Sequence, residues 1–223
     1  MTGPGLIERT PWDCAALGCD AFELADAGAE AMAQVGAPGH YTVRVDPLAS
    51  KESLHRNGFY YCDTLIEPYC PAGQLKLTPH AAAAFDLPPP LEPLLAICRE
   101  AFQHDRFHRD FNVDRRLADL RYANWLKTLH AAGKVYGLAW EGGAAGFIAH
   151  EAGKLVLHAL GAKHRGRGIA KHLWSAVCAD LARGGARELS SSISVANVPA
   201  LNLYATLGFR FRKPLDVYHR VIP

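Results

Sequence analysis

A strand, a glycine-rich turn and a helix follow one another between Lys154 and Arg183, and this succession constrains the fold more than any other stretch. The apolar run from Leu155 to Leu160 predicts a strand. The turn Arg165-Gly166-Arg167-Gly168-Ile169-Ala170 allows close approach of backbone to a ligand, and the helix after it offers unpaired N–H groups and a positive dipole end to an anion. Apolar residues at four-residue spacing then predict a helix that packs on a sheet: Ile169, Leu173, Val177 and Leu181. We therefore expect this stretch to bind a phosphorylated molecule.

The turn does not have either familiar nucleotide-binding pattern, because it contains neither G-x-G-x-x-G nor G-x-x-x-x-G-K followed by Ser or Thr. Arg165-x-x-Gly168-x-Ala170 instead resembles the R/Q-x-x-G-x-G/A signature of the GNAT N-acyltransferase superfamily. The alternative to a binding site is a tight turn with solvated arginines, since such turns are common between strands and helices.

The C-terminal part strengthens the resemblance. Residues 187–195 predict a strand, and residues 198–207 predict a helix that Asn197 caps and Gly208 ends. The pattern Asn197-x-x-Ala200-x-x-x-Tyr204-x-x-x-Gly208-Phe209 resembles the most recurrent C-terminal pattern of the family. The two matches together are more specific than the turn alone.

The resemblance implies an α/β (α+β) GNAT fold, with a mixed, mostly antiparallel central sheet whose central strands splay apart between flanking helices. It also implies acetyl-coenzyme A as cosubstrate, with its pyrophosphate on the backbone amides of the turn and its arm along the preceding strand. The implied cofactor contacts are Leu160, Ala162, Arg165, Gly166, Arg167, Gly168, Ile169, Ala170 and Asn197. For Asn197 the capping role is an equally good explanation.

Two residues are candidates for proton transfer in a direct attack of an amine on the thioester, which needs no covalent enzyme intermediate. Tyr204 matches the family tyrosine that serves as general acid, and a phenol can donate one hydrogen bond to a developing thiolate. His158 is the candidate base, with a pKa near neutrality and a place on the strand along the cofactor. The alternatives are a core tyrosine and a half-buried histidine satisfied by a neighbour.

The chain divides into two predicted domains, a small first unit (residues 1–75) and a catalytic GNAT domain (residues 80–223). In the first we expect a turn-rich entry around Trp12 and Phe22, and then a strand, a short helix and a strand: residues 41–45, 47–57 and 59–66. In the second we expect a strand, two helices and a strand pair: residues 81–86, 91–102, 115–132, 134–140 and 145–149.

A closer resemblance lies in residues 101–108, in residues 122–126 and in the N-terminal unit at Trp12-Asp13. These resemble the dTDP-fucosamine acetyltransferase family, which N-acetylates a nucleotide-linked amino sugar. The resemblance makes the first unit a truncated GNAT-like lobe and the substrate a primary amine. Arg106, His108 and Arg109 lie on a predicted loop that could contact it, unless the loop is simply solvated. Acetylation of protein or peptide amines, and a non-catalytic acyl-coenzyme A-binding module, are the other functions that the sequence leaves open.

Composition excludes several other classes. Lys and Arg number 24 against 22 acidic residues, and the net charge of +2 comes without a basic run, so we expect no nucleic-acid partner. No stretch approaches the length of a membrane span, and we expect a cytoplasmic protein without a membrane partner. Six cysteines without a C-x-x-C pair indicate reduced thiols, and His104-x-x-x-His108 lacks a second cluster, so we expect no metal. The oligomeric state stays open, a homodimer included.

Overall fold

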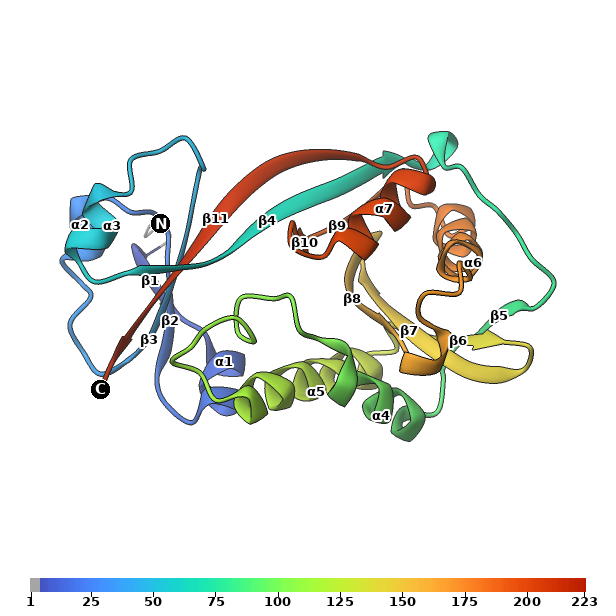
Figure 1. Ribbon diagram of the computed structural model, residues 1–223, viewed down its shortest axis with the longest axis horizontal. Helices are drawn as coiled ribbons and strands as arrows, with labels where there is room; N and C mark the ends of the chain where they lie inside the picture. The colour runs from blue at the N-terminus through green and yellow to red at the C-terminus, as the bar shows by residue number, and fades with distance from the viewer. Residues whose placement is uncertain (1–4) are drawn as a thin grey trace.

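One mixed sheet runs along the length of the molecule in the computed structural model, which describes residues 5–223 (Figure 1). The strands follow the order β1-β2-β3-β11-β4-β9-β8-β7-β6-β5, and β10 pairs with β4. Of the strand pairs, β2 with β3 and β8 with β9 are parallel and the others are antiparallel. The strands are β1 Ile7–Arg9, β2 Ala21–Leu24, β3 Gly39–Val45, β4 Tyr60–Pro71, β5 Ala83–Asp86, β6 Val135–Trp140, β7 Gly143–Glu151, β8 Lys154–Leu160, β9 Glu188–Ser191, β10 Ile193–Ser194 and β11 Arg210–Ile222. The prediction of a mixed, mostly antiparallel sheet flanked by helices is confirmed.

Helices cover both faces of the C-terminal part of this sheet. Helices α4 (Leu91–Ala101) and α5 (Arg115–Ala131) pack on one face, in a core that contains Phe147 and Leu157. Helices α6 (Ala170–Arg183) and α7 (Val198–Thr206) pack on the other, in a core that contains Leu155. The predicted apolar stripe of α6 is buried there, and each aliphatic side chain removed from water contributes about 1.5–3 kcal/mol.

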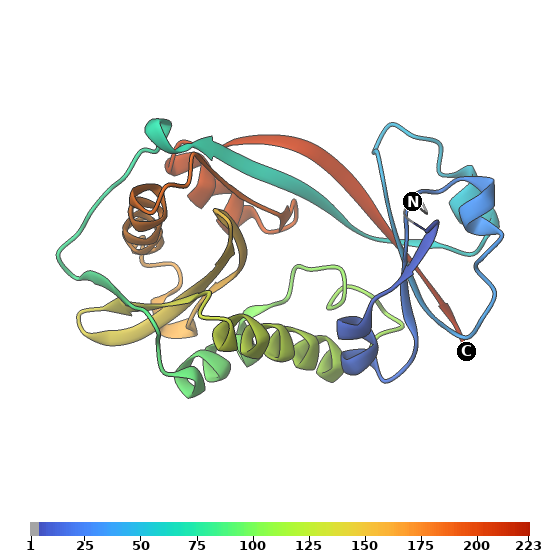
Figure 2. The same cartoon turned by 180° about the vertical axis from the view of Figure 1, so that it is seen from behind.

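Two long strands, β4 and β11, connect the N-terminal lobe to the rest of the molecule (Figure 2). The final strand β11 pairs with β4 from Arg210 to His219 and with β3 from Asp216 to Ile222. The C-terminal end of the chain therefore completes the sheet of the N-terminal lobe. The division into residues 1–75 and 80–223 stays a prediction, and residues 1–4 of its first unit lie outside the described residues.

The N-terminal lobe contains three short helices: α1 Pro11–Leu17, α2 Ala29–Met32 and α3 Glu52–Arg56. The expectation of a turn-rich entry was wrong at α1, where Pro11 occupies the first turn and Gly18 ends the helix in the left-handed conformation at φ 72°. Both are standard helix boundary signals. The lobe has its own small core, which includes Tyr41, Val43 and Leu54.

Local propensity and tertiary pairing disagree in two places. The alanine-rich run before the three prolines forms strand β5, as predicted, because Ala83 to Asp86 pair with Trp140 to Gly137 of β6. The single strand predicted for residues 187–195 is instead two, since β9 and β10 are separated at Ser192. Because of this interruption, β9 pairs with β8 but β10 does not.

Candidate active site

The two central strands β8 and β9 separate soon after they meet. Their parallel pairing is confined to Lys154 with Ser190 and Leu155 with Ser191. The hydroxyl of Ser191 donates to the carbonyl oxygen of Leu155 at 2.8 Å and closes the apex. Beyond it β10 pairs with β4 and not with β8, so the edge of β8 from Val156 to Leu160 has no strand partner among residues 5–223. This is the splay that the sequence predicts.

A β-bulge in β8 decides which side chains face the opening. Leu155 and Leu157 pair with the consecutive residues His150 and Ala149 of β7, so Val156 is an extra residue. The bulge shifts the alternation of side chains by one position. Leu155 lies in the core beneath α6 and α7, whereas Leu157 lies in the opposite core beneath α4 and α5. His158 consequently faces α6 and α7.

The structure brings the two candidate catalytic residues into direct contact. The hydroxyl of Tyr204 on α7 lies 2.9 Å from Nε2 of His158 on β8. Tyr204 is wholly buried, and its ring meets Phe209 edge to face with ring centroids 4.9 Å apart. Trp174 of α6 packs against the imidazole with centroids 5.4 Å apart. The two side chains are thus held in one geometry by the packing of both helices.

Burial keeps this pair uncharged at neutral pH. Burial lowers the pKa of His158 to about 4, far from the near-neutral value that the sequence suggested. Burial raises the pKa of Tyr204, against the opposing effects of Ser191 and Trp174 beside it. One hydrogen is therefore shared between the phenol and a neutral imidazole. Only when Nε2–H donates to the phenol oxygen is the phenol hydrogen free to bond another atom.

The turn before α6 presents a set of free backbone donors. No side chain of the described residues caps α6, and the N–H groups of His172 and Leu173 both donate to the carbonyl of Ile169. Over the described part of the chain, the N–H groups of residues 166–171 have no acceptor. Gly166 and Gly168 both have φ of 70°, and a Cβ built on either would meet nothing within 4 Å. The open N-terminus of α6 fits a pyrophosphate.

The remaining predicted cofactor residues lie at the end of β8, at the start of α6 and at the start of α7. Arg165 is directed away from the free amides, since its Nε donates to the carbonyl of Leu160 at 2.8 Å and its guanidinium reaches that of Glu100 at 3.2 Å. Ala162 begins a short 3-10 turn after β8. Arg167 and Ala170 lie at the open end of α6, where Ile169 buries its side chain. Asn197 caps α7 by accepting from the N–H of Ala200 at 3.2 Å. The cofactor roles stay predictions.

The loop between α4 and α5 is pinned by ion pairs. His108 lies between the carboxylates of Asp105 and Asp119 at 2.6 and 3.0 Å. Burial alone would lower the pKa of His108, but these two carboxylates raise it. The guanidinium of Arg106 stacks over Phe107 at 4.7 Å. Arg109 extends the other way and donates to Asp63 of β4 at 2.7 Å.

A second buried cluster, which no sequence motif marks, connects the same loop to the sheet. Asp110 accepts from the hydroxyl of Tyr60 at 2.9 Å and contacts Nδ1 of His219 at 2.7 Å. His40 approaches the same carboxylate at 3.5 Å. These residues come from β4, β11 and β3, and the ligand-type atoms of His40, Asp110 and His219 lie within 4.8 Å of one another. The expectation of no metal, which rests on the cysteines and on His104 and His108, does not extend to this group.

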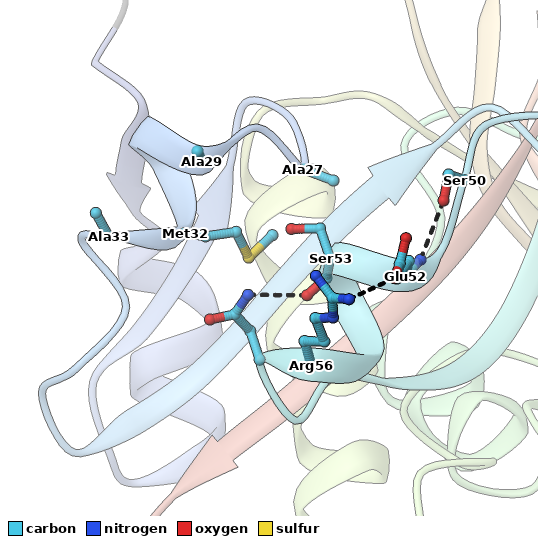
Figure 3. Close-up of a pocket in the computed structure, with 9 residues that line it drawn as sticks. Ala27, Ala29, Met32, Ala33, Ser50, Glu52, Ser53 and Arg56 are labelled. Carbon is cyan, nitrogen blue, oxygen red and sulfur yellow. Dashed lines mark hydrogen bonds and ion pairs between the residues drawn. The ribbon is translucent and has the colours of Figure 1, made fainter.

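Two surface hollows lie away from the Tyr204–His158 pair. One of about 630 Å³ lies between α2 and α3, lined by short side chains together with Met32 and the ion-paired Glu52 and Arg56 (Figure 3). Another of about 620 Å³ lies at the C-terminal end of α6, beside His150 and Asp180. Neither contains the free amides of the turn.

Among the described residues, no helix is long and apolar enough to cross a membrane.

Comparison with known proteins agrees with this geometry. The profile of the acetyltransferase (GNAT) family matches residues 95–209, just over half of the 223-residue chain. The matched region contains both strands of the splay, the turn and Tyr204. The search of curated proteins gave no match. The chain therefore belongs to the GNAT acetyltransferase family, whose members generally use acetyl-coenzyme A and act on small-molecule or peptide amines.

Solved structures with low sequence identity share the fold. A GCN5-related N-acetyltransferase from Sphaerobacter thermophilus has a TM-score of 0.59 at 16% identity, over 83% of this chain and 60% of that one. A tandem GNAT protein from the clavulanic acid biosynthesis pathway has 0.56 at 12%, over 92% and 76%. A GCN5-related N-acetyltransferase from Kribbella flavida has 0.55 at 12%, over 90% and 80%. The chain thus spans less than two thirds of the Sphaerobacter protein.

Proposed function

We propose that this protein transfers an acetyl group from acetyl-coenzyme A to the primary amine of a nucleotide-linked amino sugar. The observation that carries the proposal is the 2.9 Å contact of Tyr204 with His158, on the same splayed strand that leads into the free amides of residues 166–171. A phosphate site and a proton donor are thereby joined by an open strand edge. The family supports acyl transfer, and the resemblance of the N-terminal unit supports the sugar.

The turn and the open strand edge would position the cosubstrate. The amides of residues 166–171 bind the pyrophosphate, assisted by the dipole of α6. The unpaired edge of β8 offers backbone N–H and C=O groups to the amides of the cosubstrate's arm. The side chain of Arg165 donates a hydrogen bond to the carbonyl of Leu160. This side chain has to move if that carbonyl is to bind an amide of the cosubstrate. The protein thus contributes mainly orientation.

Tyr204 would protonate the leaving thiolate. Its hydroxyl is buried, and a hydrogen bond in such surroundings is stronger than in water. His158 orients that hydroxyl by donating Nε2–H to it, which leaves the phenol hydrogen for sulfur. The sequence points to His158 as the base, but a pKa of about 4 makes it a weak proton acceptor at neutral pH. Its proposed role is therefore to position Tyr204.

A mass-resolved screen tests the function. The protein is incubated with acetyl-coenzyme A and with amino sugars, their nucleotide adducts, polyamines and peptides, and each product is identified by its added acetyl mass. Preferential acetylation of a nucleotide-linked amino sugar supports the proposal. Acetylation of peptides alone would indicate a protein acetyltransferase. Cofactor binding by calorimetry with no acetylated product would indicate a binding module.

A further inference from the structure

The buried carboxylate of Asp63 accepts several hydrogen bonds at one oxygen, and its other oxygen accepts none from the described residues. Its Oδ1 accepts from the hydroxyl of Ser194 and the guanidinium of Arg109, both at 2.7 Å, and from the N–H of Thr64 at 2.9 Å. Its Oδ2 is buried and has no hydrogen-bond partner in the described chain. The side chain of Asp63 has 0% exposure.

This distribution of donors is unfavourable for the protein on its own. Buried carboxylate oxygens normally each have a donor, because a desolvated and unpaired oxygen costs more than a typical hydrogen bond returns. Three donors from three segments converge on one oxygen while the other has none. A ligand that brings a donor to Oδ2 would remove the deficit.

Asp63 lies beside the splay, on the face opposite Tyr204. Ile193 of β10 pairs with Ile66 and packs in the core under α6 and α7. Because side chains alternate along a strand, the next residue, Ser194, faces the side of α4 and α5. The bond from Ser194 places Asp63 on that side too. The loop between α4 and α5 reaches the same place through Arg109, and Figure 1 shows this loop rising from the helices toward β4.

Tyr204 and Asp63 both lie beside the chain segment that follows the apex of the splay. Ser191, beside Tyr204, and Ser194, which donates to Asp63, are three residues apart in the sequence. A thioester in the opening would therefore have its sulfur toward Tyr204 and the attacking amine toward Asp63.

We propose that Oδ2 of Asp63 receives the ammonium group of the amine substrate and accepts its proton. The inference rests on the proposed function and specifies that the substrate enters from the face of α4 and α5. A nitrogen–hydrogen bond breaks, its proton goes to Asp63, and the freed electron pair forms the carbon–nitrogen bond. The carbon–sulfur bond breaks with its electrons on sulfur, which takes the hydrogen of Tyr204. The second proton of nitrogen restores the phenol, and that on Asp63 leaves to water.

The surroundings of Asp63 suit a proton acceptor. Burial raises the pKa of Asp63, against the opposing effects of Ser194 and Arg109, so its affinity for a proton exceeds that of an exposed carboxylate. Arg109 is one third exposed, which lets water screen its repulsion of an incoming cation. The next residue, Asp110, is anchored by Tyr60 and His219, and this holds the loop from which Arg109 donates to Oδ1.

The first test compares Asp63→Asn with Asp216→Asn. Asp216 is a matched carboxylate on β11 that accepts from Thr64 at 2.7 Å but lies outside the splay. With dTDP-fucosamine as probe, Asp63→Asn should lower kcat/KM by ~10²-fold and leave acetyl-coenzyme A affinity unchanged. Its kcat/KM should also keep rising with pH until the free amine itself is neutral. Asp216→Asn should match the wild type in all three, and an Asp63→Asn variant with wild-type kinetics and pH profile overturns the inference.

A second test needs no variant and no turnover. In calorimetric titrations of the wild-type protein loaded with coenzyme A, dTDP-fucosamine should bind at least ~10-fold more tightly than dTDP-fucose, whose hydroxyl carries no charge. Equal affinities, or no binding of the amine, would overturn the role of Asp63. Tight amine binding without acetylation would instead reject the proposed function and leave the Asp63 site supported.

Discussion

Replacing Tyr204 by Phe removes one buried hydroxyl and keeps the ring that packs on Phe209. The Nε2 atom of the half-buried His158 would then lose its hydrogen-bond partner at 2.9 Å. That deficit costs about 1–3 kcal/mol. For a chain of this size it corresponds to a melting temperature lower by about 2–12 °C.

The same substitution should lower kcat by ~10²-fold, because the leaving thiolate loses its proton donor. Affinity for acetyl-coenzyme A should not change, since the hydroxyl does not contact the pyrophosphate site. The matched control is Tyr136→Phe, which removes a hydroxyl that donates to Asp180 at 2.9 Å away from the splay. The Tyr136→Phe variant should have a lower melting temperature and the kcat of the wild type.

Steady-state kinetics, calorimetric titration and thermal denaturation on both purified variants give the three quantities. Equal turnover in the two variants, with Tyr204→Phe within about threefold of the wild type, would refute the assignment of Tyr204 as the acid. The contact with His158 would then be structural only.

Three further outcomes are expected. Gly168→Pro should abolish measurable binding of acetyl-coenzyme A, because proline lacks the amide N–H and cannot adopt φ of 70°. The control Gly133→Pro changes a glycine of similar φ after α5, and this variant should be less stable but still bind acetyl-coenzyme A. Asp114→Ala should lower the free energy of unfolding in urea by about 1 kcal/mol, because the Asp114 carboxylate accepts from the N–H of Arg116 at 2.8 Å. An unchanged midpoint of urea unfolding would contradict that capping role. The folded-state pKa of His158 lies below its unfolded value, so its stabilising contribution, on the order of 3 kcal/mol, is present above pH 6.5 and lost toward pH 4. His158→Gln should therefore show a shallower loss of stability over this window than the wild type, and equal slopes would count against the buried neutral imidazole.

Local sequence patterns predicted the elements whose signals lie within one segment. The apolar run of β8, the glycines after it and the stripe of α6 each carry such a signal, and Asn197 and Gly208 mark the ends of α7. The motif that contains Tyr204 therefore placed it on the correct helix. Helix α1 could also have been found, since Pro11 and Gly18 bound it.

Features that depend on pairing between distant segments could not be predicted in this way. The bulge at Val156 exists only relative to β7, and it alone turns His158 toward Tyr204. Strand β11 completes a sheet begun about 170 residues earlier in the sequence, at β3. Asp63 has no local motif, because its three donors come from its own neighbour, from the loop before α5 and from β10. Burial in turn set the pKa of His158, which no sequence pattern reports.

A crystal structure of the complex with acetyl-coenzyme A would examine the splay, the turn and Tyr204 at once. We expect the pyrophosphate oxygens within about 3.2 Å of the N–H groups of residues 166–171, and the sulfur within about 3.5 Å of the Tyr204 hydroxyl. The arm should lie along the open edge of β8. A pyrophosphate bound away from the turn, or a sulfur out of hydrogen-bond reach of Tyr204, would contradict the mechanism.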